Sequence, residues 1–379
     1  MAKDLFPSTH PLTPPLTEEE WLLWLRLLRS RRVGVSTFFR LMHEYGTAEA
    51  ALEALPHVAK DAGVSGYHPF PLEQAQAEWQ RARQSGARAV AINTPTYPDA
   101  LAQISDPPPF LWCIGNSELM QRPMIALVGA RNASSLGTRM ARKLAQELGE
   151  AGFIVVSGLA RGVDAAAHTA ALETGTIAVM AGGVDVIYPS ENAVLGQEIE
   201  ENGLRVSEIA MSLHPTARHF PRRNRLISGM AQAVVVIEAA AKSGSLITAR
   251  TALDQGRDVL AVPGHPFDPR GSGCNMLIRD GATLVRGARD VIDALAEPER
   301  QTSAPKAPTP DPERAPTFTE RTADLHRQIL DRLGPSPVPE DQLIRDLKRD
   351  ASVVSPEIST LEVEGKLRRE PGGFLARID

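Results

Sequence analysis

Hydrophobic residues fall into short, nearly uninterrupted runs between residues 124 and 285, and amphipathic segments separate these runs. Such runs indicate buried parallel strands with helices between them, because a strand covered on both faces carries apolar side chains in both directions. The predicted strands are Met124–Val128, Phe153–Val156, Thr176–Met180, Leu204–Val206, Ala233–Ile237, Asp258–Val262 and Thr283–Val285. We therefore predict an α/β fold with an extended Rossmann-like, doubly wound and mostly parallel sheet, closed by a helix over Ala288–Ala296.

The N-terminal region has the helical period instead. Thr17 followed by Glu20 forms a capping box, which predicts a helix that begins at Thr17. Further apolar residues at helical spacing flank Gly34, and the pattern resembles a SAM-like or helix-hairpin-helix domain. The hairpin of that family carries a pair of glycines that lets its amides approach DNA, whereas only Gly34 is present here. We favour a packing or protein-contact role for this domain.

A proline-rich stretch precedes a third region. Residues 298–316 hold six prolines and little that could be buried, which is typical of a linker. Three short helices and two strands follow it, a pattern that predicts a C-terminal winged helix; they are expected over Ala323–Leu333, Pro339–Lys348, Val353–Glu364, Lys366–Glu370 and Phe374–Ile378. We predict four segments: the helical domain 1–95, the Rossmann-like domain 96–297, the linker 298–318 and the winged helix 319–379.

Composition excludes several classes of protein. The 379 residues include only two cysteines, Cys113 and Cys274, too few for a disulfide framework or a cysteine-ligated zinc site. No apolar run approaches the ~20 residues that span a bilayer, and residues 1–17 lack the apolar core of a signal peptide. We expect a soluble cytoplasmic protein without a membrane partner, metal or cofactor. The net charge of -5 implies that any nucleic-acid binding depends on a local basic patch.

Candidate chemistry gathers where the predicted strands end, because open parallel sheets bind ligands beyond the carboxyl ends of their strands. The first end, Val128–Ser134, lacks the second glycine of a dinucleotide fingerprint, since Arg131 takes its place. No P-loop motif occurs, which excludes that class of ATPase. The turns at Ser157–Asp164 and Lys242–Ser245 each open a helix, whose free amides suit an anion.

Residues 217–250 form the basic patch, with six fixed positive charges against one acid, Glu238. Arg222, Arg223 and Arg225 surround Asn224 at the start of an apolar helix, beside Phe220. Arginine suits phosphate, and an accessible phenylalanine provides a stacking face for an unpaired base. Several such strand ends together predict a groove that follows a phosphate backbone.

Several long motifs in order resemble the DNA-processing protein A (DprA/Smf) family, over roughly Tyr97–Arg286. They are Val128–Arg131, Ser157–Asp164, Tyr188–Asn192, Phe220–Gly229, Ser243–Ala249, Pro263–Gly264 and Gly273–Asn275. The resemblance implies a non-enzymatic cytoplasmic protein of natural transformation that binds single-stranded DNA, forms a homodimer, acts beside single-strand-binding protein and loads RecA. Members often carry a lysine in the Tyr-Pro-x-x-Asn segment, where this chain has Ser190 and Glu191.

By position, the resemblance implies a set of DNA-binding residues. Arg131 would hold a phosphate, Arg223, Arg225 and Lys242 would neutralise the backbone, and Phe220 would stack a base. The full set is Arg131, Ser134, Ser157, Gly158, Arg161, Phe220, Arg222, Arg223, Asn224, Arg225, Lys242, Ser243, Gly244 and Ser245. The competing class is a nucleoside-monophosphate phosphoribohydrolase, whose P-G-G-x-G-T-x-x-E signature is absent.

Two further expectations concern surfaces outside this groove. Met276, Leu277, Ile278 and Leu284 lie at or just before the last predicted strand, where an edge strand needs cover, so we expect them at the dimer interface. The final helix could cover the same side chains instead. The predicted recognition helix 353–364 carries acids and no arginine or lysine, so we expect the winged helix to touch DNA mainly through Lys366, Arg368 and Arg369.

Overall fold

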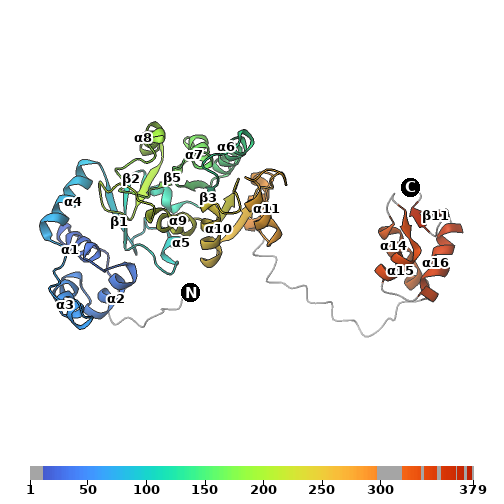
Figure 1. Ribbon diagram of the computed structural model, residues 1–379, viewed down its shortest axis with the longest axis horizontal. Coiled ribbons are helices and arrows are strands. Elements are labelled where there is room, and N and C mark those ends of the chain that lie inside the picture. Colours follow the sequence, from blue (N-terminus) through green and yellow to red (C-terminus); the bar gives the residue numbers. More distant parts are fainter. Residues whose placement is uncertain are drawn as a thin grey trace. The chain divides into compact units, whose positions relative to one another are not determined.

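The chain divides into two compact units, Met1–Arg300 and Gln301–Asp379. The computed structural model describes residues 12–296, 318–333, 337–347, 351–363, 365–370 and 374–377. Each unit has its own hydrophobic core. Figure 1 shows the first unit from blue to orange and the second in red.

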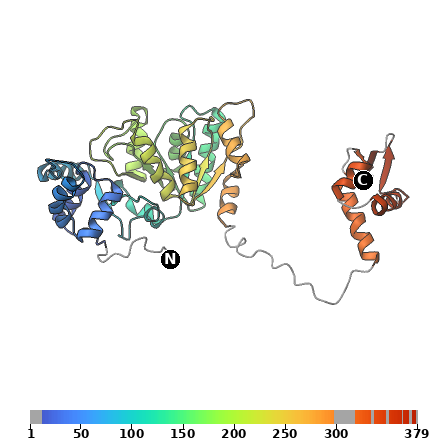
Figure 2. The same ribbon diagram turned by 60° about the horizontal axis from the view of Figure 1, so that its bottom comes forward.

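Four helices form the N-terminal part of the first unit: α1 (Glu18–Arg29), α2 (Val35–Tyr45), α3 (Ala48–Asp61) and α4 (Leu72–Gln84). The capping box is confirmed, since the Glu20 amide donates to Thr17 Oγ1 at 3.3 Å and the Thr17 amide donates to Glu20 Oε2 at 3.1 Å. Figures 1 and 2 both show these helices at one end of the unit, beside β1 and β2.

A nine-stranded sheet follows, in the order β1-β2-β6-β5-β4-β3-β7-β8-β9. The strands are β1 (Arg88–Ala91), β2 (Phe110–Gly115), β3 (Met124–Val128), β4 (Ile154–Ser157), β5 (Thr176–Val179), β6 (Leu204–Ser207), β7 (Ala233–Val236), β8 (Asp258–Ala261) and β9 (Thr283–Leu284). The parallel strands β3–β9 confirm the predicted fold class. Strands β1 and β2 were not predicted from the sequence; they pair antiparallel with each other, and β2 pairs antiparallel with β6. The sheet therefore begins at Arg88, ahead of residue 96.

Helices cover both faces of the sheet. Ile125 and Leu127 of β3 pack on α6 (Ser135–Glu150), α7 (Val163–Ala171) and α12 (Ala288–Ala296). Their neighbours Ala126 and Val128 face the core that contains α9 (His219–Met230), α10 (Gly244–Asp254) and α11 (Ser272–Arg279). Successive residues of a strand point to opposite faces, so this alternation places the two helix layers on opposite sides. Two shorter helices are α5 (Asp99–Ala102) and α8 (Ala193–Asn202).

A buried carboxylate ties the helical part to the sheet. Glu78 of α4 is 3% exposed and accepts from Arg29 Nη2 at 2.9 Å and Nε at 3.0 Å. The same carboxylate accepts from Trp112 Nε1 of β2 at 3.2 Å and from the Met211 amide at 3.3 Å. Apolar residues of α1–α4 and of the sheet belong to one core, so the two parts pack as one unit.

The expected dimer residues lie on two elements. Met276, Leu277 and Ile278 belong to α11 and are half-buried, and Leu277 and Ile278 pack against the main core. Leu284 lies on the edge strand β9 and is 41% exposed. Helix α12 packs on α6, and it leaves the Leu284 side chain open to solvent.

The second unit is the predicted winged helix. It contains α14 (Phe318–Arg332), β10 (Val338–Pro339), α15 (Glu340–Leu347), α16 (Ala351–Val363), β11 (Leu367–Glu370) and β12 (Phe374–Arg377), with sheet order β10-β12-β11. Both wing arginines are engaged with acids. Arg368 Nη2 lies 2.8 Å from Glu370 Oε1, and Arg369 pairs with Glu340 and, at 3.4 Å, with Glu362. These pairs reduce the positive charge that the wing offers to DNA.

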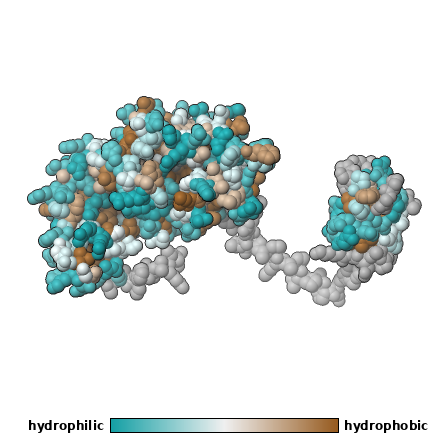
Figure 3. Space-filling model, viewed as in Figure 1, coloured by the Kyte–Doolittle hydropathy of each residue, from teal (hydrophilic) through white to brown (hydrophobic). Residues whose placement is uncertain are grey.

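Two kinds of site, a membrane-spanning helix and a metal-ligand cluster, are not found among the described residues. Hydrophilic and hydrophobic residues are interspersed over the face of the first unit in Figure 3. Across the residues that the structure describes, no helix is long and apolar enough to cross a membrane. No cluster of three or more potential His, Cys, Asp or Glu metal ligands is found among those residues.

Candidate nucleic-acid interface

The candidate site lies at the topological switch point of the sheet. Strands β3 and β7 are hydrogen-bonded neighbours, but α6 after β3 and α10 after β7 cover opposite faces. This divergence opens a crevice at the carboxyl ends of the two strands, where doubly wound folds bind ligands. A hollow of about 590 Å³ occupies the place, and we call it the basic groove. It is lined by residues 128–132, Ala160, Asp164, Phe220, Pro221, Arg223, Asn224, Ile227, Ala240, residues 242–245, Ile247, Thr248 and Arg270.

The groove brings together eight of the residues expected to bind DNA, from three distant parts of the chain. They are Arg131, Phe220, Arg223, Asn224, Lys242, Ser243, Gly244 and Ser245. Ser134, Ser157, Gly158, Arg161, Arg222 and Arg225 do not line it. The phosphate-binding chemistry therefore concentrates at the ends of β3 and β7 and at the start of α9.

Arg131 and Phe220 line the groove and contact each other. The Arg131 guanidinium carbon lies 5.0 Å from the centroid of the Phe220 ring, and Arg131 is exposed. The Tyr188 ring lies 6.0 Å from the same ring, at an angle of 59°. This cation–π contact orients Arg131 while its N–H groups stay available for an anion. Phe220 is half-buried, so part of its ring remains accessible.

Helix α10 supplies the opposite wall. Ser243 caps the helix by accepting from the Ser245 amide at 3.3 Å, and its hydroxyl lies 2.6 Å from Ser245 Oγ. A Cβ at Gly244 would meet nothing within 4 Å, so a ligand can approach the backbone there. Lys242 precedes the cap and is exposed. A lysine and a helix N-terminus together favour a phosphate at this wall.

Arg223 lies in the floor of the groove rather than on its surface. The side chain is 6% exposed, and Nη1 donates to the carbonyl oxygens of Gly158 and Val179, the latter at 2.8 Å. Burial lowers the pKa of Arg223 to about 10, so the group stays charged at neutral pH. Arg223 thus joins the ends of β4 and β5 and adds positive potential to the floor of the groove.

Four other residues that were expected to bind DNA form hydrogen bonds or ion pairs within the protein. Ser157 Oγ donates to the Leu127 carbonyl at 2.6 Å, and the Gly158 amide donates to Asp164 Oδ2 at 3.1 Å. Arg225 is 9% exposed; it pairs with Glu208 and also lies 3.2 Å from Asp106. Ser134 donates to Glu238 Oε1 at 2.5 Å. These four residues have structural hydrogen bonds or ion pairs where a role towards DNA was expected.

Arg161 and Arg222 are exposed but lie beside acids. Arg161 Nη1 is 3.6 Å from Glu191 Oε1, and Arg222 Nη2 is 3.9 Å from Glu208 Oε1. Glu191 stands in the segment where family members often carry a lysine. Its charge therefore offsets Arg161 at the rim of this surface.

Carboxylates of the chain itself occupy the backbone amides at the start of α6 and in the predicted anion-binding turn Ser157–Asp164. Glu238 accepts from the Ser134 amide at 2.9 Å and so occupies the N-terminus of α6. Asp164 accepts from the Gly158 and Ala160 amides, and burial raises its pKa. The turn that Asp164 closes requires Gly162, which has φ +77°. Glu238 and Ser134 are 104 residues apart, so the sequence alone could not indicate their contact.

Some groove residues were not predicted from the sequence. Arg270 comes from the loop after β8, and its Nη2 lies 3.0 Å from Asp268 Oδ2. Asn132, Ile247 and Thr248 line the groove beside residues that the sequence did indicate. Arg270 lies between two of the family motifs, Pro263–Gly264 and Gly273–Asn275. This position could have indicated from the sequence that Arg270 belongs to the site.

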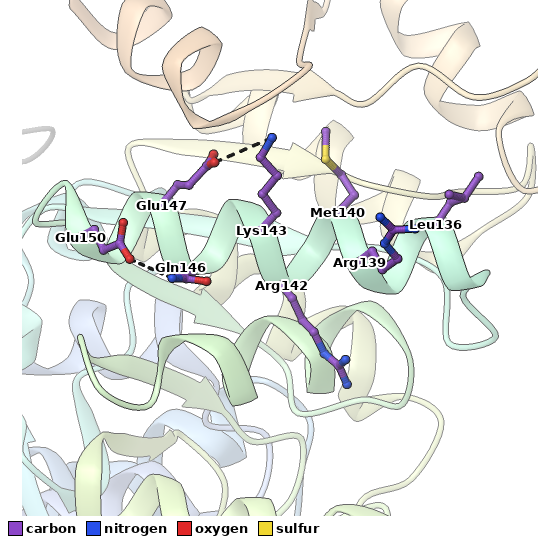
Figure 4. Close-up of a pocket in the computed structure, with 8 residues that line it drawn as sticks. All are labelled: Leu136, Arg139, Met140, Arg142, Lys143, Gln146, Glu147 and Glu150. Atoms are coloured by element: carbon purple, nitrogen blue, oxygen red, sulfur yellow. Dashed lines mark hydrogen bonds and ion pairs between the residues drawn. The ribbon is translucent and has the colours of Figure 1, made fainter.

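A second hollow of about 630 Å³ lies along the outer face of α6 (Figure 4). All of its lining residues belong to this one helix, and acids accompany its cations. Lys143 Nζ lies 3.8 Å from Glu147 Oε1, and Gln146 bonds Glu150 at 2.9 Å. The side chains of this hollow carry both charges and come from one helix, so they do not converge on a ligand. Those of the basic groove come from several parts of the chain.

The fold and the groove define a Rossmann-like protein that presents cations, helix amides and an aromatic ring to a phosphate-bearing ligand. Residues 88–296 match the family model of the DNA recombination-mediator protein A. Residues 18–81 match the DprA-like N-terminal HHH domain, and residues 302–373 match the DprA winged helix domain. The chain belongs to the DprA/Smf family, so the resemblance seen in the sequence is confirmed. Membership of this family assigns the chain a DNA-processing, recombination-mediator role.

Individual relatives agree with this assignment. DNA processing protein DprA of Bacillus subtilis is 39% identical over 226 residues, covering 59% of this chain and 76% of that protein. The X-ray structure of DprA from Streptococcus pneumoniae is 34% identical with a TM-score of 0.63, covering 74% of this chain and 98% of that one. DNA processing protein A from Helicobacter pylori, solved to describe its single-stranded DNA binding mode, is 31% identical with a TM-score of 0.52, covering 56% and 98%.

Proposed function

We propose that this chain binds single-stranded DNA in the basic groove and thereby acts as a recombination mediator of natural transformation. The observation that carries the proposal is the convergence of Arg131, Lys242, the α10 N-terminus and Phe220 on one hollow at the switch point. The single-stranded DNA binding mode described for the Helicobacter pylori relative supports it.

The geometry favours a single strand over a duplex. Arg131 and Lys242 suit the phosphates, whereas the accessible part of the Phe220 ring suits a base that is not paired. The bases of a duplex are stacked on each other and cannot reach a ring in a hollow without unpairing. Phosphate contacts and stacking do not read base edges, so we expect little sequence preference.

Binding without turnover is the expected outcome. Asp164 is the one acid among the groove residues that the structure describes, and its carboxylate is buried and bonded to the Gly158 and Ala160 amides. An enzyme that hydrolyses a nucleoside monophosphate would need an accessible acid near the sugar. Asp164 instead maintains the loop between β4 and α7.

In the cytoplasm the bound strand would be protected and passed on to RecA, beside single-strand-binding protein. We further propose that two chains act as a homodimer through the edge strand β9 and α11. Exposed Leu284 and the neighbouring half-buried Ile278 support this interface, since an uncovered edge strand favours pairing with a second copy. Two linked grooves would hold a long strand more tightly than one.

The proposal is tested by fluorescence anisotropy with labelled single-stranded and duplex DNA across a salt series. The double variant Arg131→Ala, Lys242→Ala should bind the single strand more weakly and lower the log–log salt slope by about 1.4, from about 0.7 per phosphate. Arg250→Ala is the matched control, because Arg250 is exposed on α10 but does not line the groove.

Equal affinity of the double variant and the unmodified chain would contradict the proposed groove. A parallel incubation with AMP separates the two classes of function. Release of adenine would favour the phosphoribohydrolase, whereas tight oligonucleotide binding without turnover is expected for the mediator.

A further inference from the structure

The loop between β8 and α11 presents an aromatic pair to solvent. Phe267 is 91% exposed, far more than any other phenylalanine among the described residues. The His265 ring lies beside it, with ring centroids 5.6 Å apart and an angle of 40° between the planes. Neither ring contributes to a hydrophobic core of the described chain. A large exposed ring that does not stabilise the fold is available to a ligand.

The loop holds the two rings in place through its own hydrogen bonds. Phe267 donates its amide to His265 Nδ1 at 3.3 Å, and the Asp268 amide donates to the His265 carbonyl at 2.9 Å. Arg270 forms a two-pronged pair with Asp268, with both N–O distances 3.0 Å. Asn275 closes the base of the loop by bonding both backbone groups of Gly264. The loop backbone and the His265 ring are therefore preorganised, which lowers the entropy cost of binding.

The same loop is joined to the wall of the basic groove. The Ala239 amide donates to the Arg270 carbonyl at 2.7 Å, and the Gly273 amide donates to the Ala239 carbonyl at 2.7 Å. Ser272 Oγ accepts from the Ala241 amide at 3.1 Å. These bonds fix the loop beside the segment that carries Lys242, and Arg270 itself lines the groove. The groove residues that follow β3 and β7 are thus extended by residues that follow β8.

We propose that His265 and Phe267 form a second stacking site, for an unpaired base of the strand that leaves the basic groove on the β8 side. The inference rests on the proposed function and extends it. Arg131 and Phe220 hold the strand at one end of the groove, and Lys242 and Arg270 lie on its course towards the second aromatic site. Stacking accepts every base, so the site adds affinity and strand length without adding sequence preference.

The test uses the full chain with Phe267→Ala and a series of thymidine oligonucleotides of increasing length. We expect unchanged affinity for the shortest oligonucleotides that bind, and a loss of between ~5- and ~100-fold for those long enough to reach the loop. Phe267→Trp should restore the affinity for long strands. Leu253→Ala is the matched control, because Leu253 is 58% exposed in the last turn of α10, at the opposite end of that helix from the groove.

A base analogue gives a second readout. A strand with 2-aminopurine at successive positions should show quenching at a position that Phe267→Ala abolishes, while the quenching that depends on Phe220 persists. Equal binding by Phe267→Ala and the unmodified chain at every length, with unchanged quenching, would overturn the second site and leave the groove intact. A chain that binds no single strand at all would instead overturn the proposed function, and this site with it.

Discussion

Arg223→Ala is expected to destabilise the first unit, although the residue belongs to the basic patch. Its buried guanidinium donates to the carbonyls of Gly158 and Val179, and its charge favours the ionised form of buried Asp164. Hydrogen bonds to charged groups contribute about 1.5–3 kcal/mol each, and the variant loses two of them. We therefore expect unfolding to become easier by about 3–5 kcal/mol, in the range found when one partner of a buried charge pair is removed.

Urea unfolding followed by tryptophan fluorescence measures this loss, because all four tryptophans belong to the first unit: Trp21, Trp24, Trp79 and Trp112. For a urea m-value of up to about 3 kcal/mol per molar, a loss of about 3 kcal/mol lowers the midpoint by about 1 M or more. Arg131→Ala is the comparison. Arg131 is exposed, so we expect a stability change within about 1 kcal/mol together with a salt slope lower by about 0.7.

The opposite pattern would refute this reasoning. If Arg223→Ala unfolds at the midpoint of the unmodified chain and only lowers the salt slope, Arg223 must reach the DNA backbone. The expectation from the sequence would then be right, and the assignment of Arg223 to the groove floor would be wrong.

Four further predictions follow from other parts of the chain. Burial lowers the pKa of His168 to about 3, whereas the ordinary pKa is 6.5, so the neutral side chain stabilises the fold fully only above pH 6.5. At pH 5 this contribution to the free energy of unfolding is smaller by about 2 kcal/mol. His168→Gln should therefore flatten that part of the acid unfolding curve, and an unchanged curve would contradict the prediction. Glu78→Gln should lower thermal stability by several degrees, because it weakens the buried ion pair that joins α4 to α1; an unchanged melting temperature would count against that role. The pair Ile278→Glu, Leu284→Glu should elute as a folded monomer, bind short oligonucleotides normally and lose affinity for long ones, whereas a monomeric unmodified chain in light scattering would disprove the dimer. A chain that ends at Arg300 should keep most of its affinity for single-stranded DNA in anisotropy, and a large loss would assign that affinity to the winged helix.

Strands β3 to β8 were predictable because nearly all of their residues are buried, and both faces therefore carry mostly apolar side chains. Leu127 and Val128 point to different helix layers, yet both positions are apolar. Strand β1 escaped prediction because Arg88–Ala91 contains only one β-branched residue and starts with the exposed Arg88. The capping box could also be predicted from the sequence, because its partners Thr17 and Glu20 are only three residues apart.

The sequence indicated which types of residue form the site, but it did not indicate how those residues are arranged in space. Arg131, Phe220 and Lys242 carry chemistry that suits a phosphate-binding surface; the sequence indicated them as candidates, and all three line the groove. Whether an arginine faces solvent or lies beneath the surface depends on partners far along the chain. Arg223 meets the carbonyl of Gly158, 65 residues away, and Arg225 meets Glu208 and Asp106.

The layer architecture could thus be predicted from the sequence, because burial on two faces leaves short, local runs of apolar residues. Which charges remain for a ligand depends on tertiary contacts, because a charge is offset by the groups that the fold packs against it. Glu238 and Asp164 illustrate this, since each fills a helix start or turn whose free amides the sequence alone would assign to DNA. Lys242 and the start of α10 remain open to a phosphate, and Arg131 lines the same groove.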